Sequence, residues 1–501
     1  MLVVAAGGND GGDCTDPAAP TVPRAVYPAA IPEVLGVGYT SNERVYDPDS
    51  KIGSWIDIAA PGVDVLTTCG EASDYCARSG SSYASAMVSG GAALLAGRWS
   101  EPGGGWEPGL RLAHRLMDAA VDSAVADDPA TPRDESDFND FYGDGNLELR
   151  AAVSDRVVRL DGTTRLETSR SLTRESLPVA PDDDVYSSPA DRIVVAPQGF
   201  TDAEGEDVAW KDTLPAAGLL ADGETAMLLS PREQLGEAAE TELSRLFNLG
   251  PVEESDLQYN VFIPGAVSTS LSQDAENGLR TRFAGTFRVA GSSYAGTAAA
   301  LADVIAQENT GVQEAIVVSV ENPVLTELYA DAIAMSAVAA DRGLPILYVG
   351  RDLVPPETCD WLDGHDQIDT IHVAGGEAAV SEQVRLEVAA CAEISPTFAI
   401  RHGGVTRIET AAAIANAFFP DARGIALADG FAWPDAVTGA NVSAQYHAPV
   451  LLTNGAGSQL EQANMDYVAR VRDPLMDAWV LGGSAAVSDS VEAAFESAVR
   501  Q

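Results

Sequence analysis

The stretch Gly80-Ser-Ser-Tyr-Ala-Ser-Ala-Met-Val-Ser-Gly90 decides how the first part of this chain is interpreted. Gly80 permits a tight turn, and the small residues after Ser82 predict a helix that can run through a packed interior. A hydroxyl at the N-terminal end of such a helix lies near free backbone N–H groups, which favour a developing oxyanion. The stretch therefore predicts a tight turn that places the Ser82 hydroxyl at the N-terminal end of a helix.

Two further elements precede this stretch in a set order. A short apolar strand, Leu2 to Ala6, leads to Asn9, and the turn Asp57-Ile-Ala-Ala-Pro-Gly62 follows before Ser82. A lone Gly-Ser-Ser or Gly-Asn is ordinary turn chemistry, so the joint order is what singles these elements out. In that order they resemble the subtilisin-like serine protease (subtilase) family. The resemblance implies that Ser82 is acylated and that Asn9 supplies the side-chain donor of the oxyanion hole.

The chain also departs from the family pattern around Ser82. Ser81, Tyr83 and Ala86 stand where the family usually has Thr, Met and Pro. More seriously, no His precedes Ser82, although in that family the catalytic Asp and His come before the Ser. Serine is a weak nucleophile at neutral pH unless a His takes its proton and an Asp orients that His. We therefore expect these 501 residues alone to be inactive as a protease, with the export signal and the upstream strands missing.

The second part of the chain repeats itself. An apolar strand runs into Gly, small residues, Val and Ser before a charged helix in three places, Val261–Ser268, His372–Ser381 and Val480–Ser488. Such self-similarity indicates a repeat architecture, and the alternation of strands with helices predicts parallel sheets with right-handed crossovers. The expected fold class is α/β, with a truncated subtilase parallel sheet and flanking helices followed by three α/β parallel-sheet repeat domains.

Domain boundaries follow from these patterns. The run from Phe141 to Val153 resembles the turn and terminal helix that end a subtilase domain, and a charged bridge rich in Ser, Thr and Arg comes after it. The expected segments are the C-terminal portion of a subtilisin-like peptidase domain (1–157), a linker (158–185), a degenerate first repeat (186–280), a second repeat (281–395) and a third repeat (396–501).

The repeats themselves resemble the type 2 cell-wall-binding repeat family of Gram-positive surface proteins. The matching features are the helix entry Thr406-Arg-Ile-Glu-Thr-Ala411, the loop Phe431-Ala-Trp-Pro-Asp-Ala436, the strand at Pro449 and the strand end Gly482-Gly483. The resemblance implies that the repeats bind an anionic polymer or glycan of the cell wall.

Candidate ligand-facing residues lie in the third repeat. In an open parallel sheet, ligands bind at the carboxyl ends of strands, where Asp429, Trp433 and Asp435 are expected. Arg407 could offer local positive charge to an anionic polymer. The alternative is structural, since Gly pairs at strand ends usually make room for the next helix.

Composition limits the partners. The chain carries 75 acidic and 30 basic residues, and a formal charge of -45 repels nucleic acid and anionic membrane surfaces. No stretch approaches the roughly 20 apolar residues that cross a bilayer. No cofactor and no metal site are expected. A calcium site is left open, although the acidic run 122–145 lacks the regular ligand spacing that would support one.

The placement of the cysteines suggests an oxidising compartment. Cys69 and Cys76 close a short loop, and Cys359 and Cys391 flank one predicted strand-and-helix unit, so these four are expected to form disulfides. Cys14 is left over.

The function expected from these observations is an extracellular serine endopeptidase held at the cell wall by its repeats, acting on protein or peptide substrates. The alternative is a non-catalytic surface protein that binds the wall and carries an inert protease remnant. A third reading, in which the repeats have a separate enzymatic task, has no cluster of acid, base and nucleophile to recommend it.

Overall fold

The computed structural model divides the chain into two compact units, Met1–Ser154 with Ala180–Tyr186 and Asp155–Val179 with Ser187–Gln501. The described residues are 2–9, 25–31, 34–53, 55–69, 75–99, 116–117, 120, 146–147, 156–177, 190, 192–202, 205–247, 260–283, 285–321, 329–471 and 477–500.

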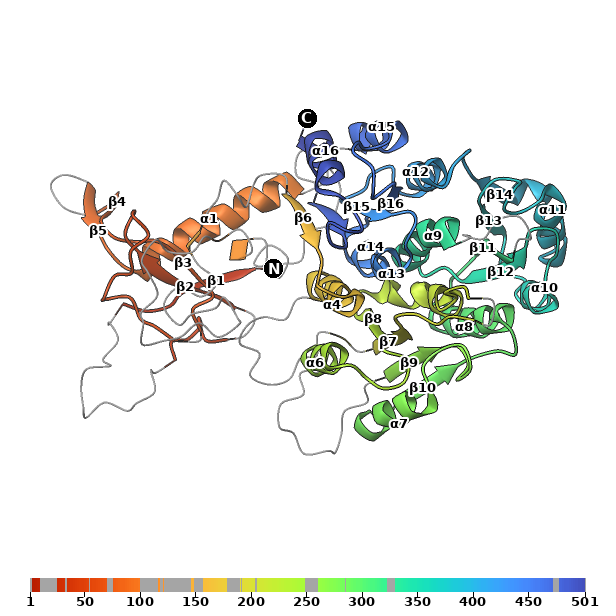
Figure 1. The fold of residues 1–501 in the computed structure, drawn as a ribbon. Helices are drawn as coiled ribbons and strands as arrows, with labels where there is room; N and C mark the ends of the chain where they lie inside the picture. The colour runs from red at the N-terminus through yellow and green to blue at the C-terminus, as the bar shows by residue number, and fades with distance from the viewer. Residues whose placement is uncertain are drawn as a thin grey trace. The chain divides into compact units, whose positions relative to one another are not determined.

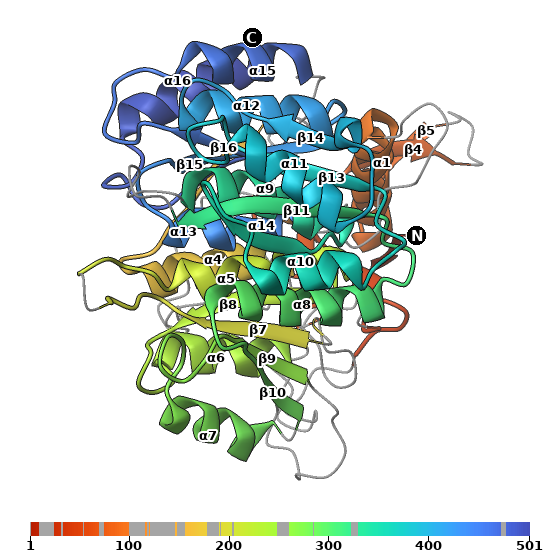
Figure 2. The same ribbon diagram turned by 90° about the vertical axis from the view of Figure 1, so that its right-hand side faces the viewer.

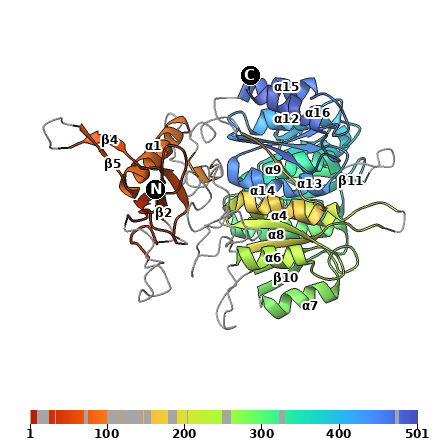
Figure 3. The same ribbon diagram turned by 60° about the vertical axis from the view of Figure 1, so that its left-hand side comes forward.

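The first unit is a small parallel sheet covered by one helix. Strands β1 (Val3–Ala6), β2 (Val34–Thr40) and β3 (Ile58–Pro61) pair in that order, and helix α1 (Ser81–Trp99) packs across all three (Figure 3). β4 (Val65–Thr68) and β5 (Tyr75–Arg78) form an antiparallel hairpin. This unit therefore brings the three motif elements of the sequence into one layer pair.

The second unit contains three four-stranded sheets, and every pairing in them is parallel. The α/β fold class predicted from the sequence is therefore confirmed. In Figure 1 the yellow-green sheet lies at the bottom, the teal sheet at the right and the mainly blue sheet at the top, and Figure 2 shows the same sheets from the side. Their strand orders are β10 (Gly285–Val289), β9 (Asn260–Pro264), β7 (Arg192–Pro197), β8 (Thr225–Ser230); β12 (Ile346–Gly350), β11 (Glu314–Glu321), β13 (Thr370–Ala374), β14 (Ala399–His402); and β16 (Val450–Thr453), β15 (Gly424–Asp429), β17 (Asp477–Leu481), β6 (Arg156–Leu160).

Helices connect and cover these strands. They are α4 (Arg165–Ser176), α5 (Trp210–Thr213), η1 (Leu214–Asp222), α6 (Glu237–Leu246), α7 (Gln273–Arg282), α8 (Tyr294–Glu308), α9 (Tyr329–Arg342), α10 (Pro356–Asp363), α11 (Glu382–Cys391), η2 (Pro396–Phe398), α12 (Arg407–Phe418), α13 (Pro434–Thr438), α14 (Ala440–Tyr446), α15 (Gln462–Val471) and α16 (Asp489–Arg500). No helix in the described part of the chain has the length and apolar character needed to span a membrane.

The last sheet is completed by the first strand of the unit. β10 and β14 each pair with the preceding strand of the same sheet and then lead directly into α8 and α12. β6 takes the same place beside β17, although more than 300 residues separate them in the chain, and it leads into α4. The second unit is therefore closed on itself.

This closure corrects the linker that the sequence analysis placed at 158–185. Residues 156–160 are a strand and Arg165–Ser176 is a helix, with Leu160 and Leu172 buried in the main core. The reason is a copy of a repeat element that the sequence analysis overlooked: Arg159-Leu-Asp-Gly-Thr-Thr-Arg-Leu-Glu-Thr168 has the spacing of Arg401-His-Gly-Gly-Val-Thr-Arg-Ile-Glu-Thr410.

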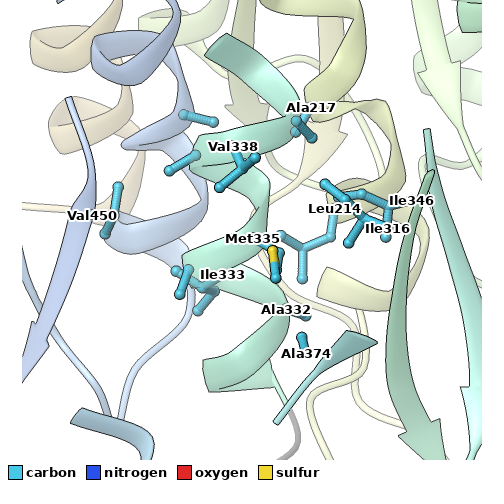
Figure 4. Close-up of a cluster of buried hydrophobic side chains, with 14 of the residues drawn as sticks. Leu214, Ala217, Ile316, Ala332, Ile333, Met335, Val338, Ile346, Ala374 and Val450 are labelled. Atoms are coloured by element: carbon cyan, nitrogen blue, oxygen red, sulfur yellow. The ribbon is translucent and has the colours of Figure 1, made fainter. Parts of the chain in front are cut away.

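Helix α9 lies at the centre of the second unit. Met335 and Val338 on α9 pack among side chains that come from all parts of the unit, including Leu214 of η1, Ile346 of β12 and Val450 of β16 (Figure 4). Residues 332–340 of α9 are all buried. A helix that is apolar all round is stable only when it is surrounded, so α9 ties the three sheets into one core.

Candidate functional site

Ser82 lies in the first turn of α1, as the motif predicts. Gly80 has a φ of +149°, and a Cβ on it would lie 3.0 Å from Asn9 Nδ2, so glycine is needed at this position. Its N–H donates to Gly62 O at 2.8 Å, which joins the Ser82 turn to the end of the predicted turn 57–62. Ser82 itself is exposed.

Asn9 follows β1 and is held by Ser81. Its Oδ1 accepts hydrogen bonds from Ser81 N and from Ser81 Oγ, both at 2.7 Å, and Ser81 Oγ accepts from Gly8 N at 3.0 Å. Because the amide oxygen takes two donors, the Nδ2 group is the part of Asn9 that remains to donate. Ser81 is buried, and its role as the clamp of Asn9 was missed because the sequence showed it only as a substitution next to Ser82.

This arrangement can stabilise an anion beside Ser82 but does not supply a base. Of the five histidines, His114 lies outside the described residues. The remaining four, His365, His372, His402 and His447, lie in the second unit and bond to its own groups.

α1 presents an exposed face that begins at Ser82. Ser82, Ala86, Gly90 and Leu94 recur at helical spacing, and all four are exposed, Leu94 by 59%. Met87 beside them is 36% exposed. A helix of small and apolar residues is usually covered on all sides, so the exposure of this face is unusual.

The structure contains a disulfide between Cys359 and Cys391, with an S–S distance of 1.98 Å. Cys76 is instead a free thiol, so the predicted bridge to Cys69 is not formed. Cys76 pairs with Thr67 across the β4–β5 hairpin, which leaves Cys69 two residues away along the strand. Diagonal neighbours across a strand pair are about 7–8 Å apart, beyond ordinary disulfide geometry.

The predicted ligand residues of the third repeat have mainly structural surroundings. Trp433 is 4% exposed, so its ring faces the core and does not face a ligand. Asp429 Oδ1 accepts from Phe431 N and Gly455 N, each at 3.2 Å, and thereby joins two loops. A local pattern of aromatic and acidic residues does not reveal which of them points inward.

Asp435 lies close to a glycine, and a close approach of an Asp to a Gly occurs once for each of the three sheets. It lies beneath Gly482, whose φ is +94° and where a Cβ would come within 2.4 Å of the carboxylate oxygen Oδ2. The same relation joins Asp212 to Gly265 and Asp331 to Gly375. Each carboxylate thus supports the turn that follows the third strand of its repeat.

Burial raises the pKa of all three carboxyl groups. The pKa of Asp331 is raised to about 6, against the opposing effect of the Arg407 guanidinium. The pKa of Asp435 is also raised to about 6, with Arg165 opposing and Asp429 adding to the shift. The pKa of Asp212 is raised by burial as well. These carboxyl groups therefore favour the protonated form more than an exposed Asp does.

An arginine holds each of these turns from the other side. Nη1 of Arg159, Arg288 and Arg401 donates to the carbonyl oxygen of Gly482, Gly265 and Gly375 at 2.7, 2.7 and 3.0 Å, respectively. These arginines lie on β6, β10 and β14, the strands that lead into the next helix. The repeated geometry shows that β6 has the same structural role as the other two strands.

Arg407 is partly exposed, as Asp429 and Asp435 are. Its Nη1 donates to Gly430 O at 2.7 Å, and its guanidinium carbon lies 4.4 Å from the ring centre of Phe431. Phe431 is 49% exposed. Among the described residues, no group of three or more His, Cys, Asp or Glu is placed to hold a metal ion.

Comparison with protein families assigns both units. The model of the subtilase family matches residues 1–145, and that of cell wall binding domain 2 (CWB2) matches residues 288–385 and 401–492. The thermophilic serine proteinase of Bacillus sp. (strain AK1) is 38% identical over 95 residues, which is 19% of this chain and 21% of that protein.

Two other similar proteins match a larger share of the chain. N-acetylmuramoyl-L-alanine amidase LytC of Bacillus subtilis is 24% identical over 305 residues, 61% of this chain and 52% of that protein. The structure of Cwp8 from Clostridium difficile aligns with a TM-score of 0.54 at 22% identity, covering 70% of this chain and 52% of that one, which shows the fold. The chain thus spans about half the length of these two relatives and about a fifth of the proteinase.

Proposed function

We propose that this chain, whose residues 1–145 belong to the subtilase family and whose residues 288–385 and 401–492 belong to the CWB2 family, is part of an exported serine endopeptidase attached to the cell wall. A cell-wall-associated protein with a protease-like domain is the coarser statement that these matches support. The cleavage of peptide bonds, the export and the residues that carry the reaction are the proposal.

In the proposed reaction, Ser82 Oγ attacks the scissile carbonyl carbon and forms an acyl-enzyme that water then hydrolyses. Asn9 Nδ2 and the N-terminal end of α1 stabilise the negative charge that develops on the carbonyl oxygen. The observation that carries this assignment is the pair of 2.7 Å hydrogen bonds from Ser81 to Asn9 Oδ1, which turns the donor side of the amide toward Gly80 and the nucleophile turn.

No histidine lies among the described residues of the first unit, and we propose that the proton of Ser82 passes to a base from outside these 501 residues. The exposed face of α1 begins at Ser82, so a polypeptide that covers this face would bring its own side chains beside the hydroxyl. An imidazole oriented by a carboxylate is the group that makes a serine reactive at neutral pH.

The second unit is proposed to be the wall anchor. The three sheets share one core and present three similar sets of loops. These loops can make several contacts with one polymer chain. The proposed repeats keep the segments 186–280, 281–395 and 396–501, with the strand and helix of residues 156–176 added to the third sheet.

A fluorophosphonate probe tests the catalytic proposal, because it reacts with an activated serine. We expect no labelling of the 501-residue chain and labelling at Ser82 in a longer protein that includes the translated sequence upstream of Met1. Ser82→Ala in the longer protein is the control and should abolish labelling. Labelling of the 501-residue chain at the rate of a subtilisin would contradict the missing base.

The upstream reading frame also separates the two candidate functions. Asp and His motifs in frame with Met1 support the peptidase. A stop codon directly upstream supports the non-catalytic wall-binding protein, for which the supporting observation is that the four described histidines all bond to groups of their own unit.

A further inference from the structure

We propose that Val405 and Phe431, between the second and third repeats, form a contact surface for a sugar ring of a wall polymer attached to peptidoglycan, an inference that rests on the wall-binding function proposed above. The two residues follow the carboxyl ends of β14 and β15, where neither Trp433 nor Asp435 offers a comparable exposed group.

Both side chains are large, apolar and open to solvent. Val405 is 94% exposed, and Phe431 is 49% exposed. Arg407 links their loops, because it lies two residues after Val405 and its guanidinium stacks on the Phe431 ring at 4.4 Å. The two exposed groups therefore belong to one small surface.

The loop of Val405 is held in place by the start of α12. Glu409 Oε2 accepts hydrogen bonds from Val405 N at 2.8 Å and from Thr406 N at 3.1 Å, and Thr406 caps the helix by accepting from Glu409 N. Val405 is exposed on a fixed backbone, which is the arrangement of a contact residue that loses little entropy on binding.

The loop of Phe431 is held in a similar way. Phe431 N donates to Asp429 Oδ1 at 3.2 Å, and Arg407 Nη1 donates to Gly430 O at 2.7 Å. One face of the ring is occupied by the guanidinium. The Phe431 ring is thus held in place and still half exposed. Exposing its apolar surface to water is unfavourable, and a ligand that covers the ring removes that unfavourable free energy.

The class of ligand follows from the charge of the chain. A protein of net charge -45 is repelled at long range by an anionic polymer. Contacts that do not depend on net charge must then supply affinity, and the C–H face of a sugar ring matches an exposed aromatic ring and a neighbouring aliphatic group.

Among the described residues, the aromatic ring that follows the first strand of the first sheet is less open than Phe431. Arg165 and Tyr294 begin α4 and α8 as Arg407 begins α12. Phe200, which follows β7, is partly buried and has the guanidinium of Arg232 5.0 Å from its ring centre. The combination of Val405, Arg407 and Phe431 is therefore the favoured surface among these.

Sedimentation of the 501-residue chain with purified Bacillus subtilis cell walls tests this surface. We expect Phe431→Ala to weaken binding roughly five- to tenfold and Val405→Ser to weaken it about twofold, because a stacking contact and a small apolar contact are lost. Phe398→Ala is the matched control: it removes an aromatic ring that is 53% exposed at the opposite, amino end of β14, and should bind like the wild type.

Walls extracted with hydrofluoric acid, which removes phosphodiester-linked polymers, should retain little of the wild-type chain. Binding to intact walls should not weaken between about 50 and 500 mM NaCl, since screening removes only repulsion. All variants are first compared by thermal unfolding to show that they are folded.

The outcomes separate the two proposals. If the wild-type chain does not sediment with intact walls, the proposed anchoring function fails. If it sediments but Phe431→Ala binds equally well, or Phe398→Ala loses as much, the surface is wrong. Equal binding to extracted walls would likewise overturn the choice of polymer.

Discussion

The two units of this chain differ in how the strands at the edges of their parallel sheets are paired. In the second unit each sheet receives its fourth strand from the segment that leads into a helix, and even the first strand, β6, finds its place beside β17. In the first unit, β1 is at the end of a three-stranded sheet, and α1 leaves an apolar face exposed. The contrast indicates that the sheets of the second unit are completed by strands of that unit, whereas the described residues of the first unit leave one face of its helix uncovered.

The largest effect should come from opening the second unit at β6. A fragment of residues 187–501 lacks the buried Leu160 and Leu172, and we expect it to lose at least about 4 kcal/mol of unfolding free energy relative to residues 155–501. Urea unfolding followed by circular dichroism measures this difference. Equal midpoints and slopes for the two fragments would show that β6 is dispensable.

That boundary also shows what the sequence could predict. The Ser82 turn and the glycine turns are short local patterns, so their chemistry and their parallel α/β setting were recognisable from residues close together in the chain. The pairing of β6 with β17 is not local, and the residues around Arg159 do not indicate that its partner is Gly482. The charged composition of the segment favoured a linker, although its Gly-x-Thr-Arg-x-Glu-Thr spacing could have identified a third copy.

The candidate sites show the same limit. Ser82 and Asn9 come together because each ends or begins an element of one sheet-and-helix layer. Trp433 and Asp435 share a motif with the exposed Phe431, yet burial separates them, and burial depends on the packing of distant elements.

The second prediction concerns the buried carboxyl group of Asp331. Its pKa is about 6 in the fold against an ordinary value of 3.8, so its stabilising contribution is present below about pH 4 and is lost as the pH rises through 6. Relative to the wild type, Asp331→Asn should therefore gain unfolding free energy on the order of 2 kcal/mol between pH 4 and pH 7.5. Unfolding midpoints at both pH values measure this gain.

Asp366→Asn is the control variant for that series, because it makes the same substitution at an exposed position. A difference between Asp331→Asn and the wild type that stays constant with pH would show that the buried carboxyl does not titrate in this range.

A third, smaller effect is expected from the arginine that holds the β6 edge. Arg159 donates to Gly482 O and Val487 O and pairs with Glu492 at 2.7 Å. Arg159→Ala leaves these partly buried acceptors without their donor and should cost about 1–3 kcal/mol of unfolding free energy. Arg500→Ala, which removes a largely exposed arginine from the same region, should cost less than about 0.5 kcal/mol. If the two variants lost similar amounts of unfolding free energy, Arg159 would not have the proposed structural role.

The smallest effect is expected on the exposed face of α1. Leu94→Glu places a charge where the side chain is already 59% exposed, so the unfolding free energy should change by less than about 0.5 kcal/mol. The tendency of the chain to self-associate should fall, which light scattering at rising concentration can measure. A strongly destabilised Leu94→Glu variant would mean that this face is already covered within the chain.

The closure of the second unit has a consequence for how its ends can be used. Arg159 and Glu492 are in direct contact, so the start and the finish of the unit are neighbours. A short peptide could join Arg500 to Asp155, and the polypeptide could then be cut at another junction between repeats without separating any paired strands. The unit is therefore suited to circular permutation. A cargo domain could be fused at any of the new termini while the same three sheets remain intact.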